Sequence, residues 1–560
     1  MERRVLLAIS LSFLVLFLYQ SLIPPPPEPA PGTPAAATAS ATPGTAAPAA
    51  ATSAPAQVPS APVAAVRADD REREFVVTTA DVEAVFTNRG ARLRHWRLRH
   101  YRDASGAPVD LVPTTDSAPL PFSLVTPDAA QSARLNDALF AVDPVAPERI
   151  DATTTPAVLA FVYEGADGLT VRKQFAFEPS GYVVTFTPQV SQGGTAVNAA
   201  VQWGPGLGDE IARSAGSGGF FSGTYVYPAE GFVYRDGEVT RYAAAAAATA
   251  GQQQGAFRFF GVDDHYFVAA VVDAPGSQKV DFGHAPLPDP ANPAAVRQLV
   301  SFAAAFDAPP PALKVFVGPK QFELLRAVDP EFTKVINFGM FAVLAVPLLG
   351  ALQWVHGFVG NYGWAIVVLT ILINLVMWPL RHKSVVSMRR MQELQPQLKA
   401  IQDRYSHLKM TDPGRQKMNE EVMALYKAKG VNPASGCVPM LLTMPVLFAF
   451  YSLLSQAIEI RGAPFAGWIT DLSQHDPWYI TPLLMGATMV WQQKLQPGTG
   501  DPVQQKVLMF MPVMFTVMFL WAPSGLVIYW FVSQLWAIGQ QYFTNWLIGP
   551  AKVPAAGGKR

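Results

Sequence analysis

Apolar residues are concentrated at the two ends of the chain, and shorter alternating runs fill the part between them. At the start, Arg3 and Arg4 precede an apolar run from Val5 to Ile23, which is about long enough to cross a bilayer as a helix. This run is longer than the core of a cleaved signal peptide, usually about 7–15 residues, so it predicts an uncleaved anchor over residues 5–23 with its N-terminus inside. The Ala-rich stretch after it contains possible cleavage sites, which leaves cleavage as the alternative.

The segment after the anchor changes character twice. Residues 24–68 are almost entirely Pro, Ala, Thr and Ser, a composition that cannot form a core and predicts an extended linker. Residues 69–331 contain short alternating runs of β-branched and aromatic residues separated by turn formers, as in LTVRKQFAFEPSGYVVTFTPQV and HYFVAAVVDAPG. This alternation predicts a large antiparallel β domain. Because the domain follows an outward-running anchor, we expect it outside the cytoplasm.

The remaining apolar runs predict helices. Residues 332–360, with Pro347 in the middle, are assigned to an amphipathic helix that lies at the membrane–water interface on the outer side of the membrane. A helix that crossed the membrane here would put every later segment on the wrong side. Five spanning helices are expected to follow. Their ranges are 361–380, 434–458, 477–495, 506–522 and 525–548, with a cytoplasmic hairpin over 381–433 and a cytoplasmic tail over 549–560.

The distribution of charge agrees with this topology. Between Arg381 and Gly430 there are eleven Lys or Arg residues and five acids, whereas the segment from Gln456 to Pro477 has one arginine and three acids. Basic residues favour the cytoplasmic side, so the first segment is expected inside and the second outside. A topology of six spans with both termini in the cytoplasm agrees with the charges of these two segments and with the basic C-terminus.

Residues 381–433 are expected to form a basic antiparallel helical hairpin. Apolar residues repeat there at intervals of three and four, as in a coiled-coil seam: Met391, Leu394, Leu398, Ile401, Tyr405, Leu408, and then Met418, Val422 and Leu425. Asp412 and Pro413 are expected to begin the second helix. The hairpin is either a solvated loop that sets topology or a docking surface for RNA, anionic lipid or a protein partner. The candidate docking residues are Arg389, Arg390, Lys399, Arg404, Lys417 and Lys427.

Composition narrows the function classes. Half of the residues are hydrophobic and 15% are charged, which is typical of a membrane protein, and the 42 acidic and 42 basic residues cancel, so net charge suggests no nucleic-acid partner. The single cysteine, Cys437, excludes an intramolecular disulfide and is expected to be a packed thiol. The eight histidines show no metal-ligand spacing, and no phosphate-binding loop or nucleophile elbow occurs. No motif therefore supports an enzyme, a metal site or a cofactor.

Polar residues at membrane depth carry the remaining chemistry. Thr370, Asn374 and Arg381 share one face of the predicted helix over 361–380 and its continuation. Further polar residues in the spans are Thr443, Ser452, Ser455, Gln456, Thr481, Thr488, Thr516, Tyr529, Ser533 and Gln534. Such residues either form interhelical hydrogen bonds or line a water-containing cavity, and for Asn374 both interpretations stay open.

Several segments resemble one known family. They include WPLRHKSVVSMRRMQELQPQLKAIQDRY, APFAGWITDLSQHDPWYITPLLMGATMVWQQKL and PVQQKVLMFMPVMFTVMFLWAPSGLVIYWFVSQL. In this order they resemble the YidC/Oxa/Alb membrane-protein insertases, specifically the YidC branch of Gram-negative bacteria. The resemblance covers the chain from about residue 335, and VEAVFTNRGARLRHWRL is similar to the start of the periplasmic domain of that branch.

This resemblance implies a multi-domain protein of the inner membrane. Its fold would be a polytopic α-helical bundle of six spans with a five-helix insertase core, plus a large periplasmic antiparallel β-supersandwich. It implies that the protein inserts membrane proteins and helps them fold through a hydrophilic groove, without nucleotide hydrolysis. The implied partners are nascent membrane proteins, the Sec translocon and its accessory subunits, ribosome or signal-recognition machinery, and membrane lipids, with no sequence-specific nucleic acid and no cofactor.

The resemblance also assigns residues, with one departure. Substrate-contacting positions of the family fall on Thr370, Met444, Leu447, Tyr529 and Trp530. The groove arginine of the family falls on Asn374, so a neutral amide replaces a cation. Either Arg381 supplies this charge from the cytoplasmic mouth of the groove, or insertion here depends less on it.

Two other classes of function are compatible with parts of the sequence. Polar residues in a bundle also line the paths of solute transporters and channels, although the sequence has no inverted repeat and no buried charge pair. The β domain could instead be a carbohydrate-processing enzyme on a membrane tether.

Overall fold

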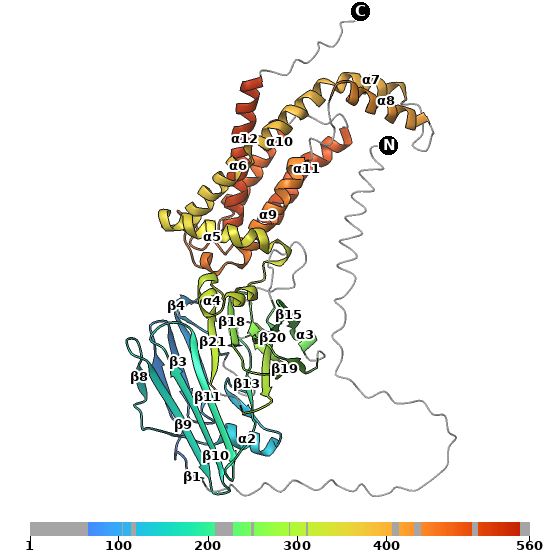
Figure 1. The fold of residues 1–560 in the computed structure, drawn as a ribbon. Coiled ribbons are helices and arrows are strands. Elements are labelled where there is room, and N and C mark those ends of the chain that lie inside the picture. Colours follow the sequence, from blue (N-terminus) through green and yellow to red (C-terminus); the bar gives the residue numbers. More distant parts are fainter. Residues whose placement is uncertain are drawn as a thin grey trace, which may run out of the picture. The chain divides into compact units, whose positions relative to one another are not determined.

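The computed structural model describes residues 65–548 apart from 104, 114–118, 208–227, 248–250, 290–291, 310–311, 406–413, 431–437 and 496–501. Several predictions fall outside these residues: the anchor, nearly all of the linker, the C-terminal tail over 549–560, Leu408, Asp412, Pro413 and Cys437. The chain divides into two compact units, with the boundary between Pro319 and Lys320 (Figure 1). Residues 320–331, assigned to the β domain from the sequence, therefore group with the helices, because the last strand has already ended.

The β unit contains three sheets. The largest has 11 strands: β1 (Ala65–Arg67), β7 (Ala141–Val142), β9 (Ala157–Gly165), β10 (Leu169–Phe177), β11 (Val183–Gln192), β12 (Thr195–Ala196), β14 (Glu230–Arg235), β15 (Glu238–Ala243), β17 (Phe259–Asp263), β18 (Phe267–Val272) and β21 (Leu313–Pro319). The second has five: β6 (Ser123–Val125), β13 (Ala200–Trp203), β16 (Gln253–Gly255), β19 (Gln278–Asp289) and β20 (Asn292–Phe306). The third also has five: β2 (Glu74–Thr78), β3 (Val82–Thr87), β4 (Arg92–Arg102), β5 (Pro108–Asp110) and β8 (Arg149–Asp151). Two short helices, α2 (Ala129–Asp137) and α3 (Ala244–Ala247), complete the unit.

The sheets pack as a sandwich, as the alternating sequence predicts. Buried and more exposed residues alternate along β10 and β11, which pair antiparallel from Leu169↔Gln192 to Phe177↔Val184. The rings of Phe86 and Phe175 join the third sheet to the largest, with centroids 4.5 Å apart. The rings of Phe260 and Phe302 join the second sheet to the largest, at 5.6 Å. Aromatic side chains between sheets therefore form the core of the unit.

Two details of the β unit differ from the predictions. The segment HYFVAAVVDAPG does not alternate, because all six residues of β18 are buried in the interior of the largest sheet, between β21 and β17. A strand in such a position reads as a continuous apolar run. Residues 65–67, assigned to the linker, form β1 and pair with β9.

The helical unit begins with short turns and continues with long helices. Its elements are α4 (Phe322–Val328), 3-10 turns over Pro330–Val335 and Gly339–Phe341, α5 (Ala342–Val359), α6 (Tyr362–Glu393), α7 (Gln395–Arg404), α8 (Gly414–Ala428), α9 (Val438–Gln456), α10 (Ile480–Leu495), α11 (Pro502–Phe519) and α12 (Ser524–Ile548). Each of the five spans predicted after residue 360 has a helix at its place. Two helical segments of the described chain are long and apolar enough to cross a membrane, Gly339–Val359 and Tyr362–Ser387. The count of six spans therefore stays a prediction.

Helix α6 is longer than the span predicted for it. The helix continues through Pro379 and past Arg381 to Glu393, so no break separates the span from the hairpin at residue 380. The boundary at residue 380 was placed where the apolar run ends, before Arg381. The continuous helix instead connects the hairpin directly to the membrane segment.

Helix α5 lacks the polar face of an amphipathic helix. Leu349 and Leu352 are buried, while Val343, Trp354 and Phe358 on other sides are 83%, 63% and 75% exposed. The exposed face is thus apolar as well, and an apolar face is stable against lipid rather than water. The side chain of Gln353 donates a hydrogen bond to Glu459 beyond α9, at 3.1 Å, which ties the two helices together. Interfacial placement of α5 stays a prediction.

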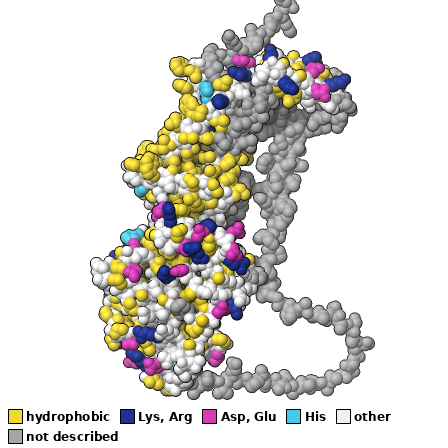
Figure 2. Space-filling view, in the orientation of Figure 1, with side chains coloured by type: hydrophobic (Ala, Val, Ile, Leu, Met, Phe, Trp, Pro, Cys, Tyr) yellow, Lys and Arg dark blue, Asp and Glu magenta, His cyan; other side chains and the backbone are white. Residues whose placement is uncertain are grey.

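The outer faces of the other long helices are also apolar. Figure 2 shows hydrophobic side chains gathered over the long helices, whereas charged side chains lie on the α7–α8 hairpin and are scattered over the β unit. On α6, Leu375 and Val376 are 54% and 77% exposed, and on α11 the exposed residues Phe510, Val513 and Val517 recur at helical spacing. This pattern is expected of helices whose outer surface meets hydrocarbon.

The loop between α9 and α10 is held by one buried carboxylate. Asp476, only 1% exposed, accepts hydrogen bonds from the backbone N–H groups of Trp478 and Thr481, from the Thr481 hydroxyl and from Trp468 Nε1. The Trp468 and Trp478 rings stack beside it, with centroids 5.6 Å apart. Burial alone would raise the pKa of Asp476, but these hydrogen bonds outweigh burial and leave the pKa below its usual value.

Replacing Asp476 by Asn should destabilise the helical unit in a pH-dependent way. The carboxylate is stabilising above the pKa of the unfolded state, and the contribution is lost as pH falls through the lowered pKa of the folded state. Thermal unfolding in detergent should show Asp476→Asn less stable by about 1.5–3 kcal/mol at neutral pH, with the difference shrinking below about pH 4. A difference that stays constant down to acid pH would contradict this role, and Asp471→Asn is the matched control in the same loop.

Candidate functional site

The candidate site lies where α6 and α12 face each other through polar side chains. On α6, Thr370, Asn374 and Arg381 are separated by four and seven residues, so they lie along one face. We call the facing set the polar seam: Thr370, Asn374 and Arg381 of α6, with Tyr529, Ser533, Gln540 and Thr544 of α12. The α12 members also recur at intervals of four, seven and four residues.

Asn374 is the centre of the polar seam. Its side chain is 3% exposed, and Nδ2 donates hydrogen bonds to the Thr370 carbonyl at 2.8 Å and to Ser533 Oγ of α12 at 3.5 Å. Its Oδ1 accepts a hydrogen bond from Arg381 Nη1 at 2.8 Å. All polar atoms of the amide group are therefore engaged, which fits the interhelical hydrogen bond that was one interpretation of this residue.

Arg381 reaches back along its own helix. Its guanidinium meets a side chain seven residues earlier, a distance of about 10 Å along the helix axis. The cation thus lies beside Asn374, the position at which the resemblance implies an arginine. No carboxylate within the described ranges lies within 4.0 Å of this guanidinium, so its charge is not neutralised there.

Polar contacts continue toward the C-terminal end of α12. Gln540 Nε2 donates a hydrogen bond to the Trp378 carbonyl at 3.3 Å, and a His382 ring nitrogen lies 3.4 Å from Thr544 Oγ1. Gln540 and Thr544 are buried, at 4% and 0% exposure. Sequence reasoning missed both residues, although their spacing from Tyr529 and Ser533 was a signal that could have found them.

A third helix reaches the polar seam through aromatic stacking. The Tyr529 ring, 5% exposed, stacks on Phe450 of α9 with centroids 4.3 Å apart and planes at 20°. Met444 and Leu447 precede Phe450 on α9 by six and three residues. Met444 is 38% exposed and Leu447 is half-buried. These two predicted contact residues thus belong to a helix that packs against the polar seam through Phe450, but their own side chains are apolar and form no hydrogen bond in it.

Trp530 lies on another side of α12. Its indole packs against Phe515 and Phe519 of α11, with centroids 5.7 and 5.2 Å apart. Its Nε1 is buried and has no hydrogen-bond partner in the described part of the chain. The structure therefore does not bring Trp530 together with Tyr529, because neighbouring residues on a helix point about 100° apart.

The basic hairpin is partly held by an acid. Arg404 and Tyr405 of the α7 end both contact Glu421 of α8, at 3.0 and 2.8 Å. Leu394 and Ile401 of the predicted seam are buried, while Met418, Val422 and Leu425 are half-buried. Arg390, Lys399, Lys417 and Lys427 are exposed, and of Arg389 only its place in α6 is described. The exposed bases are available to a partner, but nothing in the structure selects one.

Ligand sets for a metal ion are absent among the described residues: no three His, Cys, Asp or Glu side chains lie close enough together to hold one. The chemistry that the polar seam can offer is therefore hydrogen bonding and one unneutralised positive charge.

Comparison with known families covers most of the chain. A model described as the YidC periplasmic domain matches residues 74–351, and a model described as the 60Kd inner membrane protein matches residues 354–549. Together these matches leave out only the N-terminal segment, two residues between the models and the C-terminal tail.

Relatives matched over nearly their whole length agree with these matches. A protein named membrane protein insertase YidC from Syntrophus aciditrophicus is 34% identical over 571 residues, covering 97% of this chain and 99% of the relative. One of the same name from Geobacter metallireducens is 34% identical over 580 residues, covering 99% and 100%. A crystal structure titled active YidC insertase with the first transmembrane domain resolved is 18% identical, covers 86% of this chain and 94% of that one, and has a TM-score of 0.35.

The bond between Asn374 and Ser533 should be measurable as coupling between α6 and α12. In a double-mutant cycle with Asn374→Ala and Ser533→Ala, unfolding by SDS in mixed micelles should give a coupling energy of about 0.6 kcal/mol, the size typical of interhelical bonds in membranes. The matched pair Asn374→Ala with Thr544→Ala, which shares no bond, should be additive. Equal coupling in both cycles would show that the contact is not specific.

Proposed function

The chain belongs to the YidC family of membrane protein insertases, and from this premise we propose that the polar seam is the path along which it inserts membrane proteins. The protein is thus an insertase of the inner membrane with a periplasmic β domain. An incoming segment is proposed to lie between the polar seam and the N-terminal half of α9. Its apolar side meets Met444 and Leu447, and its polar flank meets α6 and α12.

One observation carries this proposal: Arg381 is bound to Asn374 and has no described carboxylate beside it. A charge among apolar helices is costly, and it persists where it pairs with other groups or serves a function. A neutral amide as the only side-chain partner leaves the guanidinium able to attract an acid. We infer that Arg381 supplies, from two turns away, the charge that the resemblance to the family places at position 374.

This arrangement lowers the cost of moving a polar substrate segment. Hydrogen-bonding groups of Thr370, Asn374 and Ser533 can replace the water that a substrate loses, and Arg381 attracts acidic residues of a translocated tail. The apolar outer faces of the bundle then accept the hydrophobic part of the substrate. No step requires a covalent bond, a nucleotide or a metal.

The topology and partners of the protein are proposed on separate grounds. The basic hairpin and the acidic loop after α9 support a cytoplasmic hairpin and, with six spans, two cytoplasmic termini. The exposed bases Lys399, Lys417 and Lys427 support docking of an anionic partner such as ribosomal RNA or signal-recognition machinery. Cooperation with the Sec translocon rests on the resemblance alone.

Moving the charge should test the inference about Arg381. Proteoliposomes carrying Arg381→Gln should insert a single-span substrate with an acidic tail roughly 5- to 30-fold less efficiently, as expected for about 1–2 kcal/mol, while a neutral-tailed substrate is little affected. The double variant Asn374→Arg with Arg381→Gln should restore insertion, because it returns the cation to the same level of the bundle. Protease protection of the translocated tail is the readout.

Two outcomes would contradict this inference. If Arg381→Gln inserts both substrates at the original rate, the cation has no role in insertion. If Arg381→Gln lowers the insertion of both substrates equally, and adding Asn374→Arg restores the insertion of neither, Arg381 serves only the packing of α6. Lys383→Gln removes a positive charge from an exposed position of the same helix that is not among the candidate docking residues, and it is the matched control.

A further inference from the structure

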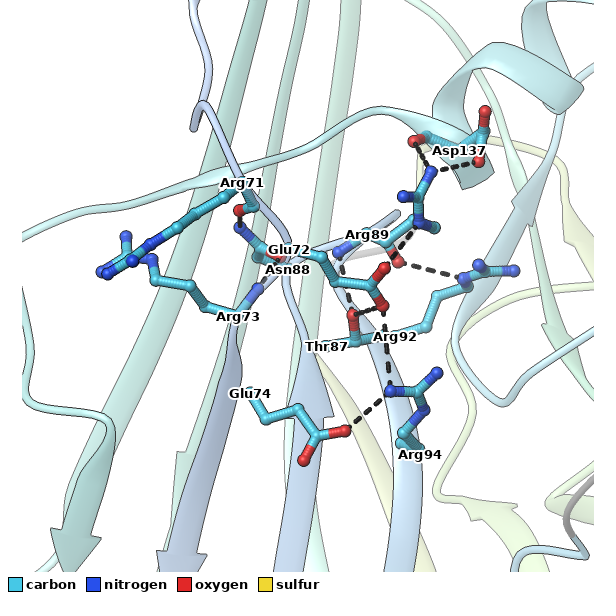
Figure 3. Close-up of polar contacts among 10 residues, drawn as sticks. All are labelled: Arg71, Glu72, Arg73, Glu74, Thr87, Asn88, Arg89, Arg92, Arg94 and Asp137. Atoms are coloured by element: carbon cyan, nitrogen blue, oxygen red, sulfur yellow. Dashed lines mark hydrogen bonds and ion pairs between the residues drawn. The ribbon is translucent and has the colours of Figure 1, made fainter.

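A turn of the β unit displays an arginine, Arg92, that forms no ion pair with a described carboxylate, although the charges of Asp137 and Glu72 act on it from farther away. The turn joins β3 to β4, and its residues Gly90 and Ala91 both have positive φ, 68° and 47°. A side chain at position 90 would meet the Asn136 carbonyl oxygen at 2.5 Å, so glycine is required there. Arg89 and Arg92 flank the turn on its outer side (Figure 3).

The turn is held from inside by a buried lysine. Lys173 of β10 is 0% exposed, and its Nζ donates hydrogen bonds to the carbonyls of Gly90 at 2.6 Å and Phe122 at 2.8 Å, with Ala91 at 3.5 Å. Three carbonyl oxygens match the three donors of an ammonium group, but none of them carries a full negative charge. Burial, followed by the nearby charge of Arg92, holds the pKa of Lys173 well below its usual value.

The acids around the turn are already engaged by other arginines. Arg89 binds Glu72 at 3.0 Å and Asp137 at 2.8 Å. Arg94 binds Glu74 at 2.7 Å and lies 3.8 Å from Glu72. The dashed contacts of Figure 3 show these carboxylates turned toward Arg89 and Arg94.

Arg92 is left with one neutral partner. Its Nε donates a hydrogen bond to the Arg89 carbonyl at 3.2 Å, and no described acid pairs with its guanidinium. Arg92 is half-buried, and burial lowers the pKa of its guanidinium, although an arginine stays charged at any ordinary pH. Since Nε is engaged, the two terminal nitrogens form an open fork of the kind that binds an oxyanion through two parallel hydrogen bonds.

We propose that the Arg92 fork, at the β3–β4 turn, is a binding site for a phosphate-type oxyanion. Because no carboxylate of the described residues pairs with Arg92, its fork favours a ligand whose negative charge is shared by two or more oxygens. The ligand is either free phosphate or the phosphate of an anionic phospholipid headgroup, since both present the same oxygens. The site gives the β unit a binding role that is separate from the polar seam of the helical unit.

Calorimetric titration of the full chain in a phosphate-free maltoside detergent tests this site. Sodium phosphate at constant ionic strength and short-chain phosphatidylglycerol are the two probes, with short-chain phosphatidylcholine as the lipid control. Arg92→Gln should weaken binding at least about tenfold, as loss of charge-assisted hydrogen bonds implies. Arg71→Gln should leave binding unchanged, because Arg71 is exposed and makes no side-chain contact with the turn. Saturation by phosphate assigns the free ion, and saturation by phosphatidylglycerol alone assigns the headgroup.

Thermal unfolding of each variant without ligand distinguishes loss of the binding site from loss of folding. Without ligand, Arg92→Gln should be at least as stable as the original protein, because it removes an unneutralised cation beside Lys173. Arg92→Lys keeps the charge, loses the fork, and should bind several-fold more weakly. The proposal is overturned if neither probe binds the original protein, or if Arg92→Gln binds as tightly as the original.

Discussion

The need to satisfy one guanidinium among apolar helices determines the architecture of the helical unit's centre. Arg381 is half-buried, and it meets its partner, Asn374, along the same face of α6. That amide is then completed by Ser533 of α12, which fixes how the two helices face each other. Tyr529, Gln540 and Thr544 extend the contact along α12, and Phe450 attaches α9 to it. Polar groups that would be costly alone become a continuous interface between helices.

The continuity of α6 connects this interface to the cytoplasmic hairpin. Because the helix passes through Pro379 without ending, Arg381 belongs to the same rigid element as Arg390 and the start of the hairpin. A partner that binds the hairpin would therefore act on the helix that carries the cation. The contacts of Glu421 with Arg404 and Tyr405 keep the two arms of the hairpin together. In the proposed function, substrate reception and the polar seam are thus parts of one mechanical unit.

Sequence periodicity predicted which residues share one face of a strand or helix, but it could not predict which other element that face contacts. The alternation of β10 and β11 and the shared face of Thr370, Asn374 and Arg381 follow directly from spacing. Which helix a face meets depends on packing of the whole bundle, so the contact of Trp530 with α11 and the roles of Gln540 and Thr544 were not predicted. The Lys173 contacts with the turn join residues 83 positions apart, a distance at which a single sequence gives no signal. The apolar run predicted where the span ends, at residue 380, but it could not predict that the helix itself continues to Glu393, since a helix can extend beyond the apolar residues.

Photocrosslinking from α6 to a stalled nascent membrane protein tests the central claim most directly. A photoreactive amino acid at position 374 reports from the polar seam, and one at Val376, which is 77% exposed on the opposite side of the helix, reports from the lipid-facing surface. The account predicts a strong crosslink from position 374 and a weak one from position 376. A crosslink from position 376 alone would contradict it, since the substrate would then pass along the outer surface and the polar seam would serve only to hold the helices together.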